Sequence, residues 1–145
     1  MTRTEFEQLR DVPDKLIAGD LSFSLKKNSR PLCILESVPV ENTLGVDLLI
    51  GGHYNPELSK IVFTFHVRGV GPICRVCING REHPGAGRTH KHDLINEDDP
   101  SGNLPHAVER PDLAKKAIHD AWVTVCRQAK IEHQGNLVLP AGGTK

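Results

Sequence analysis

Alternation of apolar and polar residues runs through the first half of the chain. The clearest apolar positions in this pattern are Leu21, Phe23, Leu25, Ile61, Phe63, Phe65 and Val67. Because successive side chains of a strand point to opposite faces, a period of two predicts strands with one face in the core. The chain is therefore expected to fold around a β-sheet.

Helical signals are confined to the two ends of the chain. Thr2 and Glu5 have the spacing of a capping box, which predicts a short helix within residues 2–17. Near the C-terminus, Pro111 suits the first turn of a helix, and helical spacing of apolar residues follows it. We therefore predict an α+β fold with a mostly antiparallel sheet of about five or six strands. A long C-terminal helix, residues 112–130, is expected to pack on one face of this sheet.

Length and charge limit the organisation of the protein. A chain of 145 residues can bury a core of its own, so we predict one domain, residues 1–145. Lys+Arg and Asp+Glu are balanced at 18 each, which disfavours a dedicated duplex-DNA or membrane-surface protein, since both need excess positive charge. No stretch is apolar enough to span a bilayer or to act as a signal peptide. We expect a cytoplasmic protein with no membrane partner.

The polar residues of greatest interest lie in residues 73–94. Residues 73–78 read as a strand, and the Asn-Gly pair at 79–80 predicts a tight type I′ turn, after which the chain runs back antiparallel. Residues 88–94 then predict a short strand. On that strand His90 and His92, two residues apart, should point to one face, roughly 7 Å from each other.

The histidine-bearing stretch 83–92 reads HPGAGRTHKH and predicts acid/base chemistry. Imidazole has a pKa near neutrality, so a pair on one face can divide the roles of acid and base. The expected catalytic residues are His90, His92, His83 and His66. Phosphate is expected to contact Arg88, Arg75 and Lys91. These are the parts of a metal-independent ribonuclease, although the same residues could simply be polar positions of a loop and a strand face.

Cys74 and Cys77 have the spacing of a zinc knuckle, which a histidine could complete. In an extended strand, however, the two thiols face opposite sides and cannot share an ion. We therefore predict no metal and no cofactor, and keep a structural zinc site as the alternative if the strand ends at Cys74. Cys77 beside Arg75 is a further candidate, as a nucleophile. We assign no role to His53, expected in a turn, or to the acidic run 97–99.

The order of these motifs resembles a known group of proteins. The segment 62–76, the His83-Pro84 step and the Thr-His-Lys-His run at 89–92 are similar in layout to the TumE-type toxin-like family of small bacterial proteins. The resemblance covers about residues 60–130. It implies His83, His90 and His92 as site residues, with Arg75 behind them. It also implies an antitoxin partner and RNA as the target.

Two functions fit the sequence. The first is a toxin-like ribonuclease that acts on RNA or another phosphodiester by histidine acid/base chemistry. The second is a non-enzymatic protein-interaction module of bacterial or phage origin, whose histidines form a binding surface or a structural zinc site. Either protein could be a homo-oligomer.

Overall fold

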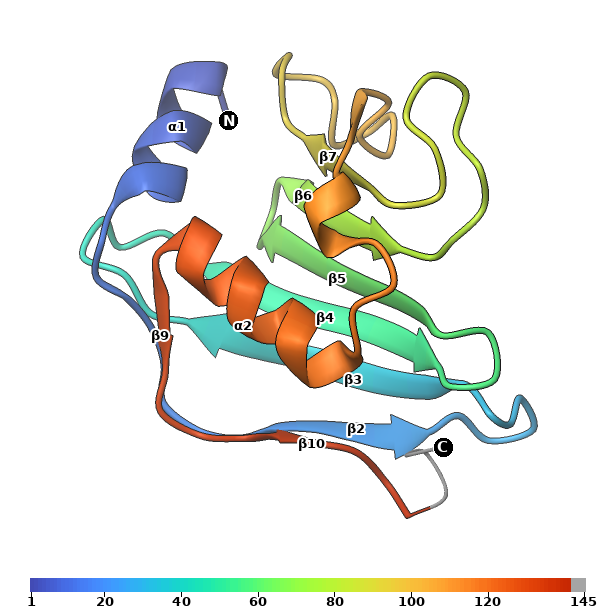
Figure 1. The fold of residues 1–145 in the computed structure, drawn as a ribbon. Helices are drawn as coiled ribbons and strands as arrows, with labels where there is room; N and C mark the ends of the chain where they lie inside the picture. The colour runs from blue at the N-terminus through green and yellow to red at the C-terminus, as the bar shows by residue number, and fades with distance from the viewer. Residues whose placement is uncertain (142–145) are drawn as a thin grey trace.

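The computed structural model describes residues 1–141 of the chain. Its main feature is an eight-stranded sheet with the order β10-β2-β3-β4-β5-β6-β7-β8 (Figure 1). The strands are β2 (Leu21–Leu25), β3 (Cys33–Val40), β4 (Leu48–Asn55), β5 (Lys60–Val67), β6 (Gly71–Ile78), β7 (His90–Asp93), β8 (Ala107–Glu109) and β10 (Leu137–Val138). Neighbours pair antiparallel except β10 with β2, which is parallel.

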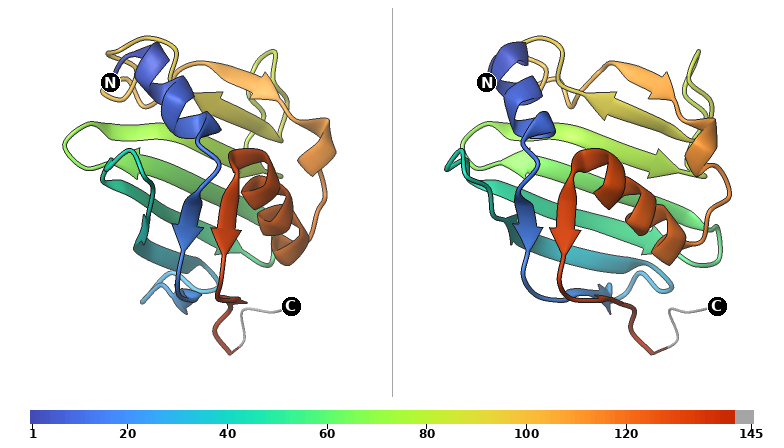
Figure 2. Two further views of the ribbon diagram at one scale, coloured as in Figure 1. Left: turned by 90° about the vertical axis from the view of Figure 1, so that its left-hand side faces the viewer. Right: turned by 60° about the vertical axis from the view of Figure 1, so that its left-hand side comes forward.

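A second layer covers one face of this sheet (Figures 1 and 2). It contains helix α1 (Arg3–Asp11), helix α2 (Ile118–Ala129) and the parallel strands β1 (Lys15–Ile17) and β9 (Ile131–His133). Apolar residues of the alternating pattern meet this layer. The ring of Phe63 on β5, for example, lies 5.0 Å from that of Trp122 on α2. The core therefore lies between the sheet and the layer that contains both helices.

The first helix forms as the capping-box spacing predicts. Thr2 Oγ1 accepts from the backbone N–H of Glu5 at 3.1 Å, and the Glu5 carboxylate accepts from the N–H of Thr2 at 2.8 Å. At the other end, the buried Lys15 donates three hydrogen bonds of 2.8 Å, to the carbonyls of Leu9, Arg10 and Val12. Neither helix in residues 1–141 is both long and apolar enough to cross a membrane.

The predicted fold class is wrong in two respects. The sheet has eight strands instead of about five or six, because three-residue β8 and two-residue β10 join it at its two edges. The short strand predicted within residues 88–94 forms as β7. Strands as short as β8 and β10 take their stability from their neighbours and leave little periodic signal. The long helix 112–130 is also absent. Residues 111–113 form a single 3-10 turn, Lys115 has a left-handed φ of 61°, and the helix begins only at Ile118.

The tight turn predicted at 79–80 is not the point where the chain reverses. The pairing of β6 continues past it, since Gly80 N–H donates to the Arg88 carbonyl at 2.9 Å. The reversal lies further out, at residues 83–87, where the His83 carbonyl accepts from the N–H groups of Ala86 and Gly87. Gly85 and Gly87 have positive φ values of 79° and 70°, which glycine adopts without strain. The longer excursion folds His83 back over the sheet.

Candidate metal centre

The register of β6 with β7 brings the site together. Cys77 pairs directly with His90, and Arg75 pairs directly with His92. All four side chains line one cavity of about 550 Å³ on the sheet face opposite α2. Strand alternation thus places His90 and His92 on one face, as the sequence predicts, and the pairing adds a thiol and a guanidinium to them.

His83 joins this group from the 79–89 loop, and the three imidazoles form a compact triangle. The ring centroids of His90 and His92 are 4.8 Å apart, and that of His83 lies 5.3 Å and 5.4 Å from them. Ala86, which is only 1% exposed, anchors the loop. The sequence left His83 across a glycine-rich bend, and this bend is what returns it to the other two histidines.

Backbone carbonyls fix the tautomers of all three histidines. Nδ1 of His92 lies 2.8 Å from the Leu104 carbonyl, Nδ1 of His90 lies 3.1 Å from that of Gly87, and Nδ1 of His83 lies 3.4 Å from that of Pro84. A carbonyl can only accept, so each Nδ1 carries the proton and each Nε2 keeps a lone pair. Within residues 1–141 no hydrogen bond occupies these Nε2 atoms. A metal-binding histidine usually donates its other ring N–H to a carbonyl or a carboxylate, as these histidines do.

Burial keeps the two strand histidines neutral. It lowers the pKa of His92 to about 4, with a further contribution from the positive charge of Arg75. It also lowers the pKa of His90. Burial raises the pKa of the Cys77 thiol, which the nearby Arg75 opposes. Neutral imidazole is the form that binds a metal, and a thiol loses its proton when it coordinates one.

The ligand atoms of Cys77, His90 and His92 all lie within 4.8 Å of one another. A tetrahedral zinc ion with Zn–N of about 2.0 Å and Zn–S of about 2.3 Å needs spacings of about 3.3–3.6 Å. Side-chain movements of about 1 Å would close the set. With His83 as a fourth ligand the site would be a closed, structural one. With His83 displaced, the open position would take water or a substrate, which the ion would polarise.

A second loop, residues 95–106, holds Arg75 and His92. Asn103 accepts from Arg75 through its side-chain oxygen at 2.8 Å and through its carbonyl at 3.2 Å. Asn103 and Leu104 both have left-handed φ, of 57° and 54°, a conformation the loop must enforce. The buried Asp99 does so: its carboxylate accepts from the N–H groups of residues 95 and 96 at 2.8 Å, and its carbonyl accepts from Leu104 N–H.

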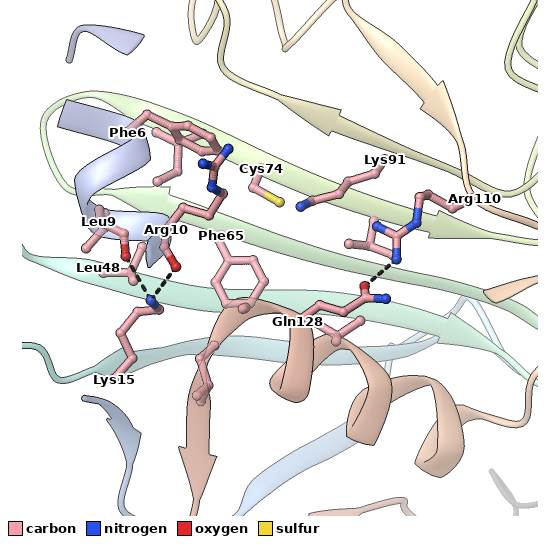
Figure 3. Close-up of a pocket in the computed structure, with 15 residues that line it drawn as sticks. Phe6, Leu9, Arg10, Lys15, Leu48, Phe65, Cys74, Lys91, Arg110 and Gln128 are labelled. Atoms are coloured by element: carbon pink, nitrogen blue, oxygen red, sulfur yellow. Dashed lines mark hydrogen bonds between the residues drawn. The ribbon is translucent and has the colours of Figure 1, made fainter. Parts of the chain in front are cut away.

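Three residues proposed from the sequence lie elsewhere. His66 does not line the cavity; it lies near the far end of β5, where its Nε2 is 3.4 Å from Ser37 Oγ. Arg88 is exposed and is absent from the cavity wall. Lys91 points to the opposite face, 3.5 Å from the carboxylate of Asp93. Figure 3 shows Lys91 and Cys74 in a separate pocket beneath α2. Cys74 and Cys77 thus face opposite sides, as alternation predicts, and cannot share an ion.

Sequence reasoning missed two contributors and misplaced a third. Cys77 was considered as a zinc ligand together with Cys74 and as a nucleophile beside Arg75, whereas it lies with His90 and His92 and away from Cys74. His53, expected in a turn, lies within β4 and lines the cavity, because that strand continues through Gly51 and Gly52 as far as Asn55. Asn103 carries no sequence signal that marks it as a partner of Arg75.

No protein-family model matches this chain, and no curated protein or solved structure is significantly similar to it. The resemblance to TumE-type toxins therefore stays a prediction.

Proposed function

We propose that the chain binds one transition-metal ion, zinc by preference, through Cys77, His90 and His92, with His83 as the fourth ligand. One observation carries the proposal: the ligand atoms of Cys77, His90 and His92 lie within 4.8 Å of one another, while Nδ1 of each strand histidine is already bonded to a backbone carbonyl. The His83 ring, 5.4 Å from that of His92, lies close enough to complete the set. A mixed set of imidazole nitrogen and thiolate sulfur favours zinc over magnesium or calcium, which prefer oxygen.

Metal analysis of the purified protein tests this proposal. After reconstitution with zinc and gel filtration, the wild type should hold about one zinc per chain. Cys77→Ser and His90→Ala should lose most of it. Cys74→Ala is the matched control, because its thiol lies on the opposite face, and it should retain the metal. Circular dichroism checks that each variant is folded.

Cobalt substitution provides a second readout that does not depend on the variants. A thiolate ligand gives cobalt a charge-transfer absorption band, and a tetrahedral site gives it intense visible bands. We expect both in the wild type. A folded wild type that takes up neither zinc nor cobalt would overturn the metal centre.

A second candidate function is the histidine acid/base mechanism on RNA or another phosphodiester. Arg75 opposite His92 favours it, because a cation beside an imidazole suits a phosphate in the transition state. RNA cleavage that persists in EDTA and disappears in His92→Ala would support it, as would growth arrest on expression and relief by an antitoxin partner. Absence of cleavage and of growth arrest would leave the interaction module with a structural zinc site.

The cysteines support a cytoplasmic location within this proposal. All four, Cys33, Cys74, Cys77 and Cys126, are free thiols. A thiolate metal ligand is best preserved in a reducing compartment.

A further inference from the structure

The cavity wall carries a positive charge that the metal site does not use. Arg75 is directly opposite His92 across the β6–β7 ladder, and both side chains line the cavity. Directly paired residues on one face have Cβ atoms about 4.5–5.5 Å apart. A ligand held by the guanidinium would therefore lie next to the metal ligands.

Arg75 is held in place but not neutralised. Both acceptors that fix its guanidinium are the uncharged oxygens of Asn103. Among the described residues no carboxylate lies within ion-pair distance of it, in contrast to Arg68 and Arg110, which pair with Asp47 at 2.7 Å and Asp112 at 2.8 Å. An oriented cation without a counter-charge is prepared for an anionic ligand.

The other charged residues of the cavity wall are also mostly positive. Lys60 and Arg81 also line it, and Glu82 is the one acidic residue among the lining residues that the structure describes. The volume of about 550 Å³ lies within the range of about 300–1,000 Å³ typical of small-molecule sites. The cavity therefore has the charge and the size for a ligand of about one nucleotide.

We infer that this cavity binds the phosphate group of a nucleotide-sized ligand, with two oxygens on Arg75 and another directed at the metal. The inference rests on the proposed metal centre. Phosphate fits better than carboxylate because it has oxygens to spare after a bidentate contact with one guanidinium. His83, which comes from a loop instead of a strand, is the ligand placed to give way to that oxygen.

The test is titration of the cobalt-substituted protein with inorganic phosphate. The visible bands should change saturably in the wild type. Arg75→Ala should weaken phosphate binding by about 10–100-fold, because it removes a charged group that makes a bidentate contact with the phosphate. Arg75→Lys keeps the positive charge but cannot make a bidentate contact, so its phosphate affinity should lie between those of the wild type and Arg75→Ala. Arg68→Ala removes an arginine outside the cavity and should bind phosphate as the wild type does.

The possible failures are distinct. A protein without cobalt bands overturns the metal centre and this inference together. Cobalt bands that phosphate leaves unchanged, or that change equally in Arg75→Ala, overturn only the inference. A nucleoside monophosphate and a short single-stranded RNA serve as further probes. Either one, if it competes with inorganic phosphate in the wild type and not in Arg75→Ala, supports the inference and shows whether the phosphate comes from a free nucleotide or from RNA.

Discussion

Cys77 and His90 are direct partners across the β6–β7 ladder. A slip of one residue would send His90 and His92 to the face beneath α2, so the site exists in one register only. Strand β7 has four residues, too few to fix that register strongly by hydrogen bonds. A metal held by both strands would therefore act as a staple between them.

Zinc is expected to protect β7 from hydrogen exchange. A ligand present at about 100 times its dissociation constant stabilises the folded state by about 2.7 kcal/mol, and here the ligands lie on β6, β7 and the loop between them. Exchange measured by mass spectrometry should slow in peptides that cover residues 76–94 and change little in peptides from α2. Equal protection with and without zinc would contradict the idea that a bound metal holds β6 and β7 together.

The histidine ligands should contribute differently to zinc affinity, depending on whether a strand or a loop carries them. His92 is 4% exposed and lies on a strand, with its Nδ1 fixed at 2.8 Å from a carbonyl, whereas His83 lies on a loop with a contact of 3.4 Å. We expect His83→Ala to weaken zinc by about 10–100-fold and His92→Ala by more. Competition with a chelator measures both. His66→Ala is the control: His66 lies on the same sheet face but outside the cavity, so this variant should bind zinc as the wild type does. If His83→Ala lost as much zinc affinity as His92→Ala, the expected difference between loop and strand ligands would be wrong.

Asp99 is expected to act on the centre without touching it. Its carboxylate holds the loop whose Leu104 carbonyl orients His92. Asp99→Ala should therefore lower zinc affinity by about tenfold while the protein stays folded. Asp98→Ala is the matched control, since Asp98 is exposed and its carboxylate makes no hydrogen bond within residues 1–141. The imidazole NMR signals of His92 should broaden in Asp99→Ala alone, an effect that simple loss of stability would not confine to one ring.

Part of this site could be predicted from the alternation of side chains within single strands. The shared face of His90 and His92, and the opposite orientations of Cys74 and Cys77, follow from strand alternation, which needs no knowledge of the partner strands. Arg75 was a candidate for the same reason. These features depend only on spacing within one strand, and the structure keeps them.

Features of the site that depend on how two separate segments of the chain pair could not be predicted from the sequence. The Cys77–His90 pairing requires the length of the excursion between β6 and β7, and the Asn-Gly signal at 79–80 placed the reversal too early. The strand count was wrong for the same reason, because two- and three-residue strands such as β10 and β8 form only where a neighbour supplies the hydrogen bonds. His66 was favoured as a strand-face histidine, but the bulge between β5 and β6 and its position near the strand end leave it outside the cavity.

Acid should remove one identifiable contribution to stability. Hydrogen bonds from Arg110 lower the pKa of Asp112 to about 2, and Gln128 on α2 adds another. Because the folded pKa is lower than the unfolded one, this contribution is complete above about pH 4 and is lost as the pH falls towards 2. Solvent exposure of the carboxylate limits it to about 1 kcal/mol.

Urea unfolding of the metal-free protein measures the contribution of the Asp112 carboxylate to the free energy of unfolding. Asp112→Asn should be less stable than the wild type by about 1 kcal/mol near neutral pH, and the difference should shrink as the pH falls from about 4 to about 2. Asp98→Asn, whose carboxylate is exposed and unbonded, should show no such convergence. A difference that stays constant with pH would assign the effect of Asp112→Asn to packing instead of charge.

Gly52 couples the stability of the sheet to the shape of the cavity. A Cβ at this position would lie 2.3 Å from the backbone carbonyl oxygen of Val62, so any side chain would force β4 away from β5. Gly52→Ala should cost about 1–3 kcal/mol of unfolding free energy. Gly19→Ala is the matched control, because nothing lies within 4 Å of its Cβ position, and it should change stability by less than about 0.5 kcal/mol.

The same substitution should also reach the cavity. Val62 and the adjacent His53 both line it, and Val62 is the β5 partner of Cys77. Separation of β4 from β5 would move Val62 and with it the strand that carries the thiol. Zinc affinity measured in Gly52→Ala under conditions where it is fully folded should therefore fall below that of Gly19→Ala. Equal stability and equal zinc affinity in the two variants would show that the strands have room for the extra methyl group.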